Sequence, residues 1–446
     1  KDGEIEESLV DEKVRNILRM MLRLKMIGPE KKHRKTGAYN TEEHRRAVLD
    51  VARESMILLK NEDQVLPLQA ESGCKVAVIG ANAAAIHSNG GGSAEIKALY
   101  EISPLMGIKK LLGGNVKVSY APGYVIPDKK EASEINWQAA STETAEDTEK
   151  ESTVSGRTLD EKQQEALAEA VALAKASDIV IFVGGLNHDF DVEGLDRVNM
   201  KLPYGQDEVI DALLKAVPDT VVCMYAGAPV EMPWAEKAKA ILWSYYAGME
   251  GGTALAEILS GKVNPSGKLA ETFIRDASQC PAHTIGTFGK KDRVEYREGV
   301  MVGYRYYDTK KTDVLFPFGH GLSYTAFTYN DLEIIRQQEN GRQTVKVSCS
   351  VTNTGEHAGK ETVQIYVAPE QKKDRPVHEL KAFEKVRLDA GETKRICVIL
   401  EERDFSRYDT DKKMPVPVNG TYEIQVGASS TDICLCGKID LFFAEG

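Results

Sequence analysis

The run Asp178-Ile-Val-Ile-Phe-Val-Gly-Gly185 is almost entirely apolar, is the length of one strand, and ends in two glycines. Similar apolar runs recur at residues 75–80, 115–120, 219–225 and 240–246. Segments with helical periodicity lie between them, including 160–175 and 206–216. This alternation predicts an α/β three-layer sandwich, in which helices cover both faces of a mostly parallel sheet. Ligands of such sheets bind beyond the carboxyl ends of the strands.

The segment before this region predicts two helices. A helix over about 42–60 leads into the first apolar run, and an amphipathic helix covers Ser8 to Ile27. A polar linker at 31–39 separates the two helices. A lone helix with an apolar face needs a partner surface. We favour the last helix of a preceding domain over a helix that packs on the rest of this chain.

The chain becomes all-β after about residue 325 and predicts an immunoglobulin-like (fibronectin type III-like) β-sandwich. Strand-like runs fall at 344–352, 361–367, 394–400, 421–426 and 432–443. The polar stretch Ile126–Gly156 is expected to be a solvated excursion, in which Trp137 is only a weak candidate anchor. The expected domains are 1–40 (helix and linker), 41–285 (α/β sandwich), 286–325 (interdomain linker) and 326–446 (β-sandwich).

Composition excludes several classes of function. The 446 residues carry a net charge of −11, which repels phosphate backbones, so nucleic acid is not expected as a partner. Seven scattered cysteines without CxxC spacing predict neither a disulfide framework nor a zinc site. No apolar run is long enough for a transmembrane helix, and no signal peptide is visible at the first residues. We expect no metal and no cofactor.

The stretch Asp191-Val-Glu-Gly-Leu-Asp-Arg197 follows the apolar run that ends at Gly185. It therefore lies where the sheet rule places a ligand site, and a carboxylate there can serve as a general acid. Composition alone favours a plainer interpretation, a solvated acidic loop with an internal ion pair between Asp196 and Arg197.

Three other stretches are candidates for function. The glycine run Asn89-Gly-Gly-Gly-Ser93 lacks the spacing of a phosphate-binding loop. It instead predicts a close-approach loop that presents Ser93 to a ligand, or a flexible connection. The glycines of 245–252, together with the turn at 263–269, are expected to be mostly structural. The tyrosines of 298–308 are candidates for stacking on a sugar or for packing between domains, and we favour interdomain packing.

In this order the stretches resemble glycoside hydrolase family 3, a family of β-glucosidases and β-xylosidases, over nearly the whole chain. The segments that carry the resemblance are 10–19, 52–61 with Leu66-Pro-Leu68, 193–197 with Leu202-Pro203 and Gln206, 264–269, and 315–324. The first resembles the final helix of the family's (β/α)₈ barrel, and the last leads into its fibronectin type III-like domain. The resemblance implies that Glu193 is the catalytic acid/base and that Ser93, Asp196 and Arg197 contact the substrate.

The resemblance further implies a retaining exo-acting β-glycosidase, most simply a β-glucosidase, that acts on oligosaccharides or glycosides. The family's nucleophile is an aspartate in a Ser-Asp-Trp setting on the barrel, and no Ser-Asp precedes any of the three tryptophans here. A barrel needs roughly 250 residues. We therefore expect a C-terminal portion that is inactive without its N-terminal barrel. The resemblance favours a secreted or periplasmic protein, and it leaves a homodimer open.

Three alternatives remain. The first is a β-xylosidase of the same family. It would differ from a β-glucosidase in its contacts to the cleaved sugar, and most of those contacts would come from the barrel. A carbohydrate-binding or scaffold protein derived from the family would keep both domains without catalysis. A nucleotide-dependent α/β enzyme would use the Gly90–Gly92 loop, although no phosphate-reading lysine follows it.

Overall fold

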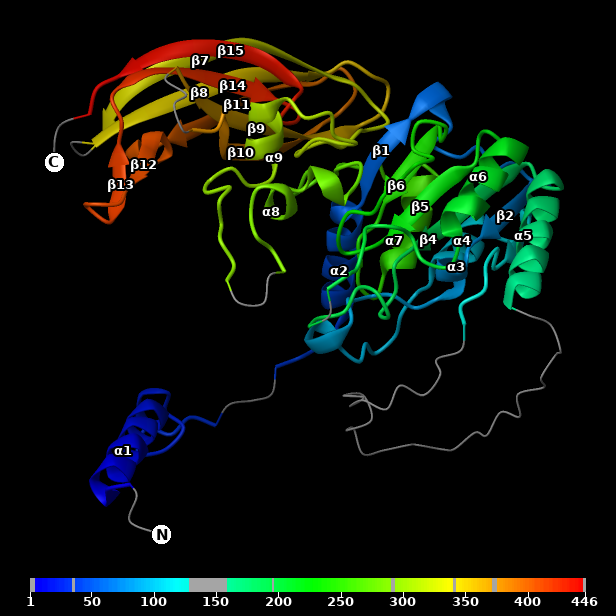
Figure 1. Ribbon diagram of the computed structural model, residues 1–446, viewed down its shortest axis with the longest axis horizontal. Coiled ribbons are helices and arrows are strands. Elements are labelled where there is room, and N and C mark those ends of the chain that lie inside the picture. Colours follow the sequence, from blue (N-terminus) through cyan, green and yellow to red (C-terminus); the bar gives the residue numbers. More distant parts are fainter. Residues whose placement is uncertain are drawn as a thin grey trace. The chain divides into compact units, whose positions relative to one another are not determined.

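The structure, a computed structural model, describes residues 5–33, 37–127, 159–194, 196–289, 293–339, 342–370 and 375–443 (Figure 1). The chain divides into two compact units, residues 1–46 and 47–446. Most of the expected excursion at 126–156, including Trp137, lies outside the described residues.

The first unit contains the predicted N-terminal helix. Helix α1 (Glu7–Arg23) ends four residues earlier than the predicted Ile27. Its apolar side chains are exposed, among them Leu9, Val14 and Ile17. The second helix, α2 (Glu42–Ser55), begins in this unit and continues into the next.

The predicted helix over 42–60 is wrong in its last part. Helix α2 stops at Ser55, and strand β1 (Ile57–Asn61) follows and pairs antiparallel with strand β6. The physical reason is burial, because Met56, Ile57, Leu58 and Leu59 are all at most 1% exposed. A helix against a sheet buries one face, whereas an edge strand between two helical layers buries side chains on both of its faces.

The predicted mostly parallel sheet is confirmed. Its strands are β2 (Lys75–Ile79), β3 (Lys117–Ala121), β4 (Ile179–Gly185), β5 (Val221–Tyr225) and β6 (Ala240–Trp243). They are parallel, and together with β1 they form a sheet in the order β1-β6-β5-β4-β2-β3.

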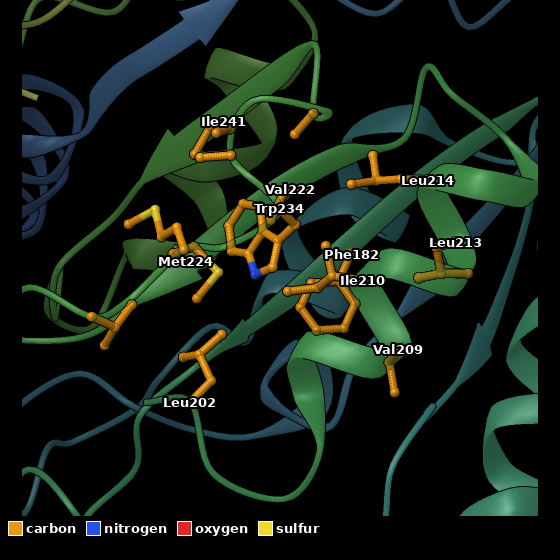
Figure 2. Packing of buried hydrophobic residues seen from close by; sticks show 14 of the residues in the cluster. Phe182, Leu202, Val209, Ile210, Leu213, Leu214, Val222, Met224, Trp234 and Ile241 are labelled. Atoms are coloured by element: carbon orange, nitrogen blue, oxygen red, sulfur yellow. The ribbon is translucent and has the colours of Figure 1, made fainter. Parts of the chain in front are cut away.

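Helices cover both faces of this sheet (Figure 1). Helices α5 (Leu159–Lys175) and α6 (Gln206–Ala216) share one hydrophobic core with one face, where Phe182, Ile210 and Trp234 are buried (Figure 2). Helices α3 (Ala81–Ala84), α4 (Pro104–Leu112) and α7 (Gly251–Leu259) share a second core with the opposite face. Successive side chains of one strand enter different cores, since strand neighbours point to opposite faces.

The strand order places a topological switch point between β2 and β4. The chain leaves β2 through α3 and α4 on one face, and it leaves β4 through α6 on the other. The two strands are neighbours in the sheet, so the loops that follow them begin side by side at its carboxyl edge, before the chain continues to opposite faces. Open α/β sheets bind ligands at such a switch point.

The segment between the sheet and the sandwich contains α8 (Pro281–Thr284) and α9 (Tyr304–Lys310). Short 3₁₀ helices occur at Glu62–Gln64, Gly92–Ala94, Ala277–Gln279 and Glu402–Phe405. Tyr304 is buried, stacks on Phe318 at 4.6 Å between ring centroids, and accepts a hydrogen bond from the Leu380 amide at 2.7 Å. These contacts support interdomain packing for this tyrosine.

The predicted β-sandwich is also confirmed, and all its strand pairs are antiparallel. One sheet has the order β10-β9-β14-β15 and the other β11-β8-β7, with a small β12-β13 hairpin beside them. The strands are β7 (Phe327–Glu339), β8 (Arg342–Asn353), β9 (Gly359–Pro369), β10 (Glu379–Leu388), β11 (Thr393–Leu400), β12 (Ser406–Asp409), β13 (Met414–Pro417), β14 (Gly420–Gly427) and β15 (Ile433–Leu441). The sequence did not predict β7 and β10, which are edge strands with few buried side chains.

Candidate active site

Two loops meet beyond the carboxyl ends of β2 and β4. One follows β2 and contains the glycine run, and the other follows β4 and contains the acidic stretch. A single parallel bridge joins Gly91 to Val192, and the Gly91 amide donates to the Asp191 carbonyl at 3.0 Å. The structure therefore joins the two stretches that the sequence singled out separately.

Glu193 lies on the second loop and is exposed. Its Oε2 accepts a hydrogen bond from the backbone N–H of Ser93 at 3.0 Å. The loops approach so closely that a Cβ on Gly92 would lie 2.7 Å from the Cβ of Glu193, and Gly92 also has a φ of +75°. Glycine is the residue that tolerates both conditions. The structure therefore places Ser93 beside the candidate acid, through its backbone.

Among the described residues, the carboxylate of Asp191 accepts two hydrogen bonds, whereas that of Glu193 accepts one. Asp191 Oδ2 accepts from the Gly227 amide at 2.6 Å and from the Tyr246 hydroxyl at 3.0 Å. Burial, and then the neighbouring Asp191 carboxylate, raise the pKa of Tyr246, so this hydroxyl keeps its proton and donates it. The sequence included Asp191 in its acidic stretch without giving it a role, and it placed Tyr246 at the end of an apolar run without giving it one.

Asp196 and Arg197 have different surroundings. Asp196 is exposed, whereas Arg197 is half-buried and donates to the Pro229 carbonyl at 2.9 Å. Within the part of the chain that the structure describes, Arg197 donates to a backbone carbonyl and forms no ion pair with Asp196, so the expected internal pair is wrong. Arg197 lies near Glu271, whose pKa is raised by burial against the opposing effect of the Arg197 charge.

Two histidines line the loops, and the sequence did not indicate them. The rings of His87 and His188 lie 5.7 Å apart, and His188 Nε2 lies 2.7 Å from the Asn89 carbonyl oxygen. Burial, and then the charge of His188, lower the pKa of His87 to about 4, so His87 is neutral near pH 7. Single histidines scattered over one hundred positions carry no pattern, so only the fold brings them together.

The described residues contain no cluster of three or more His, Cys, Asp or Glu side chains arranged to hold a metal ion. Among the same residues, every helix is too short or too polar to cross a membrane.

A family model described as the glycosyl hydrolase family 3 C-terminal domain matches residues 56–324 of this chain. The chain belongs to glycosyl hydrolase family 3. A second model, the fibronectin type III-like domain, matches residues 361–430. Both matches agree with the resemblance and with the fold class expected from the sequence.

Other members of glycosyl hydrolase family 3 align with almost the whole chain. Thermostable β-glucosidase B of Acetivibrio thermocellus is 38% identical over 98% of this chain and 53% of its own length. β-Glucosidase BoGH3A of Bacteroides ovatus is 37% identical over 97% of this chain and 56% of its own length. A crystal structure of the family 3 β-glucosidase of Bifidobacterium adolescentis matches with a TM-score of 0.80 and 33% identity, over 99% of this chain and 59% of that one. The chain thus spans about half the length of the curated relatives it matches.

Proposed function

We propose that this chain is the C-terminal portion of a retaining, exo-acting β-glucosidase, in which Glu193 is the general acid/base. The observation that carries the proposal is the position of Glu193, an exposed carboxylate at the switch point of the sheet with one oxygen held by the Ser93 amide. The names of the relatives support glucose as the cleaved sugar.

The proposed chemistry divides the work between two carboxylates. Glu193 gives its proton to the glycosidic oxygen as the bond to the anomeric carbon breaks, and a second carboxylate attacks that carbon. Glu193 then takes a proton from the water that hydrolyses the glycosyl-enzyme intermediate. We place the second carboxylate on an N-terminal (β/α)₈ barrel and interpret α1 as the last helix of that barrel, because its apolar face is exposed. The chain alone is then inactive.

The test compares residues 1–446 with the full-length gene product that contains them, using an aryl β-glucoside. We expect turnover only from the full-length product. Glu193→Gln should lower its kcat/KM for phenyl β-glucoside by about 10²- to 10⁴-fold. Glu208→Gln, an exposed glutamate at the start of α6, is the matched control and should leave activity unchanged.

A second measurement identifies the role of Glu193. With Glu193→Ala, added azide should be converted into β-glucosyl azide, because a small anion can attack the intermediate where the carboxylate stood. Turnover by residues 1–446 alone, or a Glu193→Gln variant with the activity of the native enzyme, would contradict the proposal.

A further inference from the structure

Among the described residues between Gly185 and Gln206, the loop that carries Glu193 has no helix and no ladder of strand pairs. Its conformation must therefore come from individual contacts. We infer that Asp191 is the positioning residue that holds Glu193 in place for proton donation. This inference rests on the proposed function, because it assigns Asp191 a part in the same reaction.

The contacts of Asp191 connect loops that follow four different strands. Its carboxylate accepts from Gly227 after β5 and from Tyr246 after β6. Its carbonyl accepts from Gly91 after β2, and its own amide donates to the Asn187 carbonyl at 2.9 Å within the loop after β4. One residue thus connects the loop of Glu193 to the loops that follow β2, β5 and β6.

The two donors to the carboxylate suit a permanent anchor. Hydrogen bonds to an ionised carboxylate are short and roughly twice as strong as neutral ones, and the 2.6 Å bond from Gly227 fits that class. A Cβ at position 227 would lie 2.8 Å from Asp191 Oδ2, so glycine at this position permits the close approach. Tyr246 is half-buried, and its raised pKa keeps it a donor over the working pH range.

Only Val192 separates Asp191 from Glu193 in the chain. Among the described residues, the carboxylate of Glu193 accepts one hydrogen bond, from the Ser93 amide, and Ser93 is itself exposed. A proton donor must lie within hydrogen-bonding reach of the leaving oxygen, and a misplacement of about 1 Å can cost about 100-fold in rate. Loss of the Asp191 contacts should therefore reduce the rate of proton donation more than it reduces the affinity for substrate.

The test uses the full-length gene product and aryl β-glucosides whose leaving groups differ in pKa. A dinitrophenolate leaves without protonation, whereas a phenolate needs the acid. We expect Asp191→Ala to lower kcat/KM about 10- to 100-fold for phenyl β-glucoside and less than about threefold for the dinitrophenyl substrate. A merely structural defect would lower both values together.

Three variants complete the design. Asp191→Asn keeps an acceptor oxygen but not the charge, so it should show the same selectivity with a smaller loss, and it decides the question if Asp191→Ala does not fold. Tyr246→Phe removes one of the two donors and should have an intermediate effect. Asp189→Asn lies on the same loop, leaves the Asp191 contacts intact, and should match the native enzyme for both substrates.

The outcomes separate the inference from the proposed function. If Glu193→Gln is selective for poor leaving groups but neither Asp191 variant is, the inference is wrong and the proposed function stands. If Glu193→Gln itself shows no such selectivity, the proposed function fails and the inference fails with it. If both the Glu193 and the Asp191 variants are selective, both are supported.

Discussion

The parallel sheet and the β-sandwich are both built from apolar strands, but they differ in where their polar side chains gather. The carboxyl edge of the parallel sheet collects polar side chains from several loops, whereas the interior of the sandwich is a hydrophobic core. At the edge, loops after four strands converge on Asp191 and Glu193, and burial shifts the pKa of His87 and of Tyr246. In the sandwich, antiparallel strands enclose a hydrophobic core that includes Val351, Leu388 and Ile424. Parallel strands bring all their carboxyl ends to one edge, whereas antiparallel strands distribute their loops over two ends. We therefore expect changes at the edge to alter activity and changes in the sandwich to alter stability.

The largest effect is expected in the sandwich core. Ile424 is fully buried, and Ile424→Ala should lower the free energy of unfolding by about 2–5 kcal/mol, because it removes packed methyl groups and leaves a cavity. Urea denaturation measures this loss. Ile399→Ala, at a position that is 47% exposed, is the matched control and should cost well under half as much. An unchanged unfolding midpoint in Ile424→Ala would contradict the comparison.

The next effect concerns activity at the sheet edge. Gly92→Ala should lower kcat/KM of the full-length product about 10- to 100-fold, because the new Cβ displaces Glu193. Gly113→Ala is the control, since Gly113 has a similar φ of +72° but open space around its Cβ. Both substitutions should destabilise the fold by about 1 kcal/mol through the left-handed backbone. Equal activity in the two variants would show that the contact at Gly92 does not matter.

A smaller effect is expected from a half-buried carboxylate near the same edge. Burial raises the pKa of Asp207 to about 6, although its carboxylate accepts from Trp234 Nε1 at 2.8 Å. Because the folded state binds this proton more tightly than the unfolded state, the group stabilises the fold below its ordinary pKa near 3.8. That contribution is lost as pH rises through about 6.

Asp207→Asn removes the titrating group and keeps an acceptor for Trp234. Relative to the native chain, the variant should gain about 1 kcal/mol at pH 8, a value reduced for the partial exposure of Asp207. The gain should disappear near pH 4. Thermal unfolding at the two pH values measures the difference, and a gain that is equal at both would rule out this cause.

The smallest effect is expected from an ion pair on the sandwich surface. Arg395 Nη2 and Glu333 Oε2 are 2.7 Å apart, with side chains that are 47% and 50% exposed. Water screens such a pair, so Glu333→Gln should change the free energy of unfolding by less than about 1 kcal/mol and leave kcat/KM unchanged. Chemical denaturation at low and high salt checks this prediction, and a large loss at both salt concentrations would contradict it.

Much of the fold was predictable because its signals are local. The apolar runs at β2, β4, β5 and β6 and the periodicity of α5 and α6 predicted both the element types and the alternation of a parallel sheet. The prediction failed where burial depends on neighbours. The run at 57–61 looks like a continued helix until β6 pairs with it. The edge strands β7 and β10 alternate apolar and polar side chains only in short stretches, because a register shift interrupts each strand, between Asn330 and Glu333 in β7 and between Leu380 and Ala382 in β10.

The candidate site was predictable only in part. The order of motifs drew attention to Glu193 and Ser93, and the structure places the two side by side. Asp191, Tyr246 and the two histidines carry no motif that assigns them a role. The position of Tyr246 at the end of an apolar run was the one available signal, because it placed the residue at the carboxyl edge of a predicted strand.

The sequence by itself determined most of the strands and helices of the parallel sheet, but not β1, and it determined which loop carries Glu193, because hydrophobic periodicity and glycine positions act over a few residues. Only the tertiary structure decided that β2, β4, β5 and β6 end beside one another. That arrangement brings Gly227 and Tyr246 to Asp191 across sequence separations of 36 and 55 residues. Strand order depends on how the helices cover both faces of the sheet, which no single segment of sequence encodes. For that reason the contacts that hold the Glu193 loop are visible in the fold and not in the sequence motif.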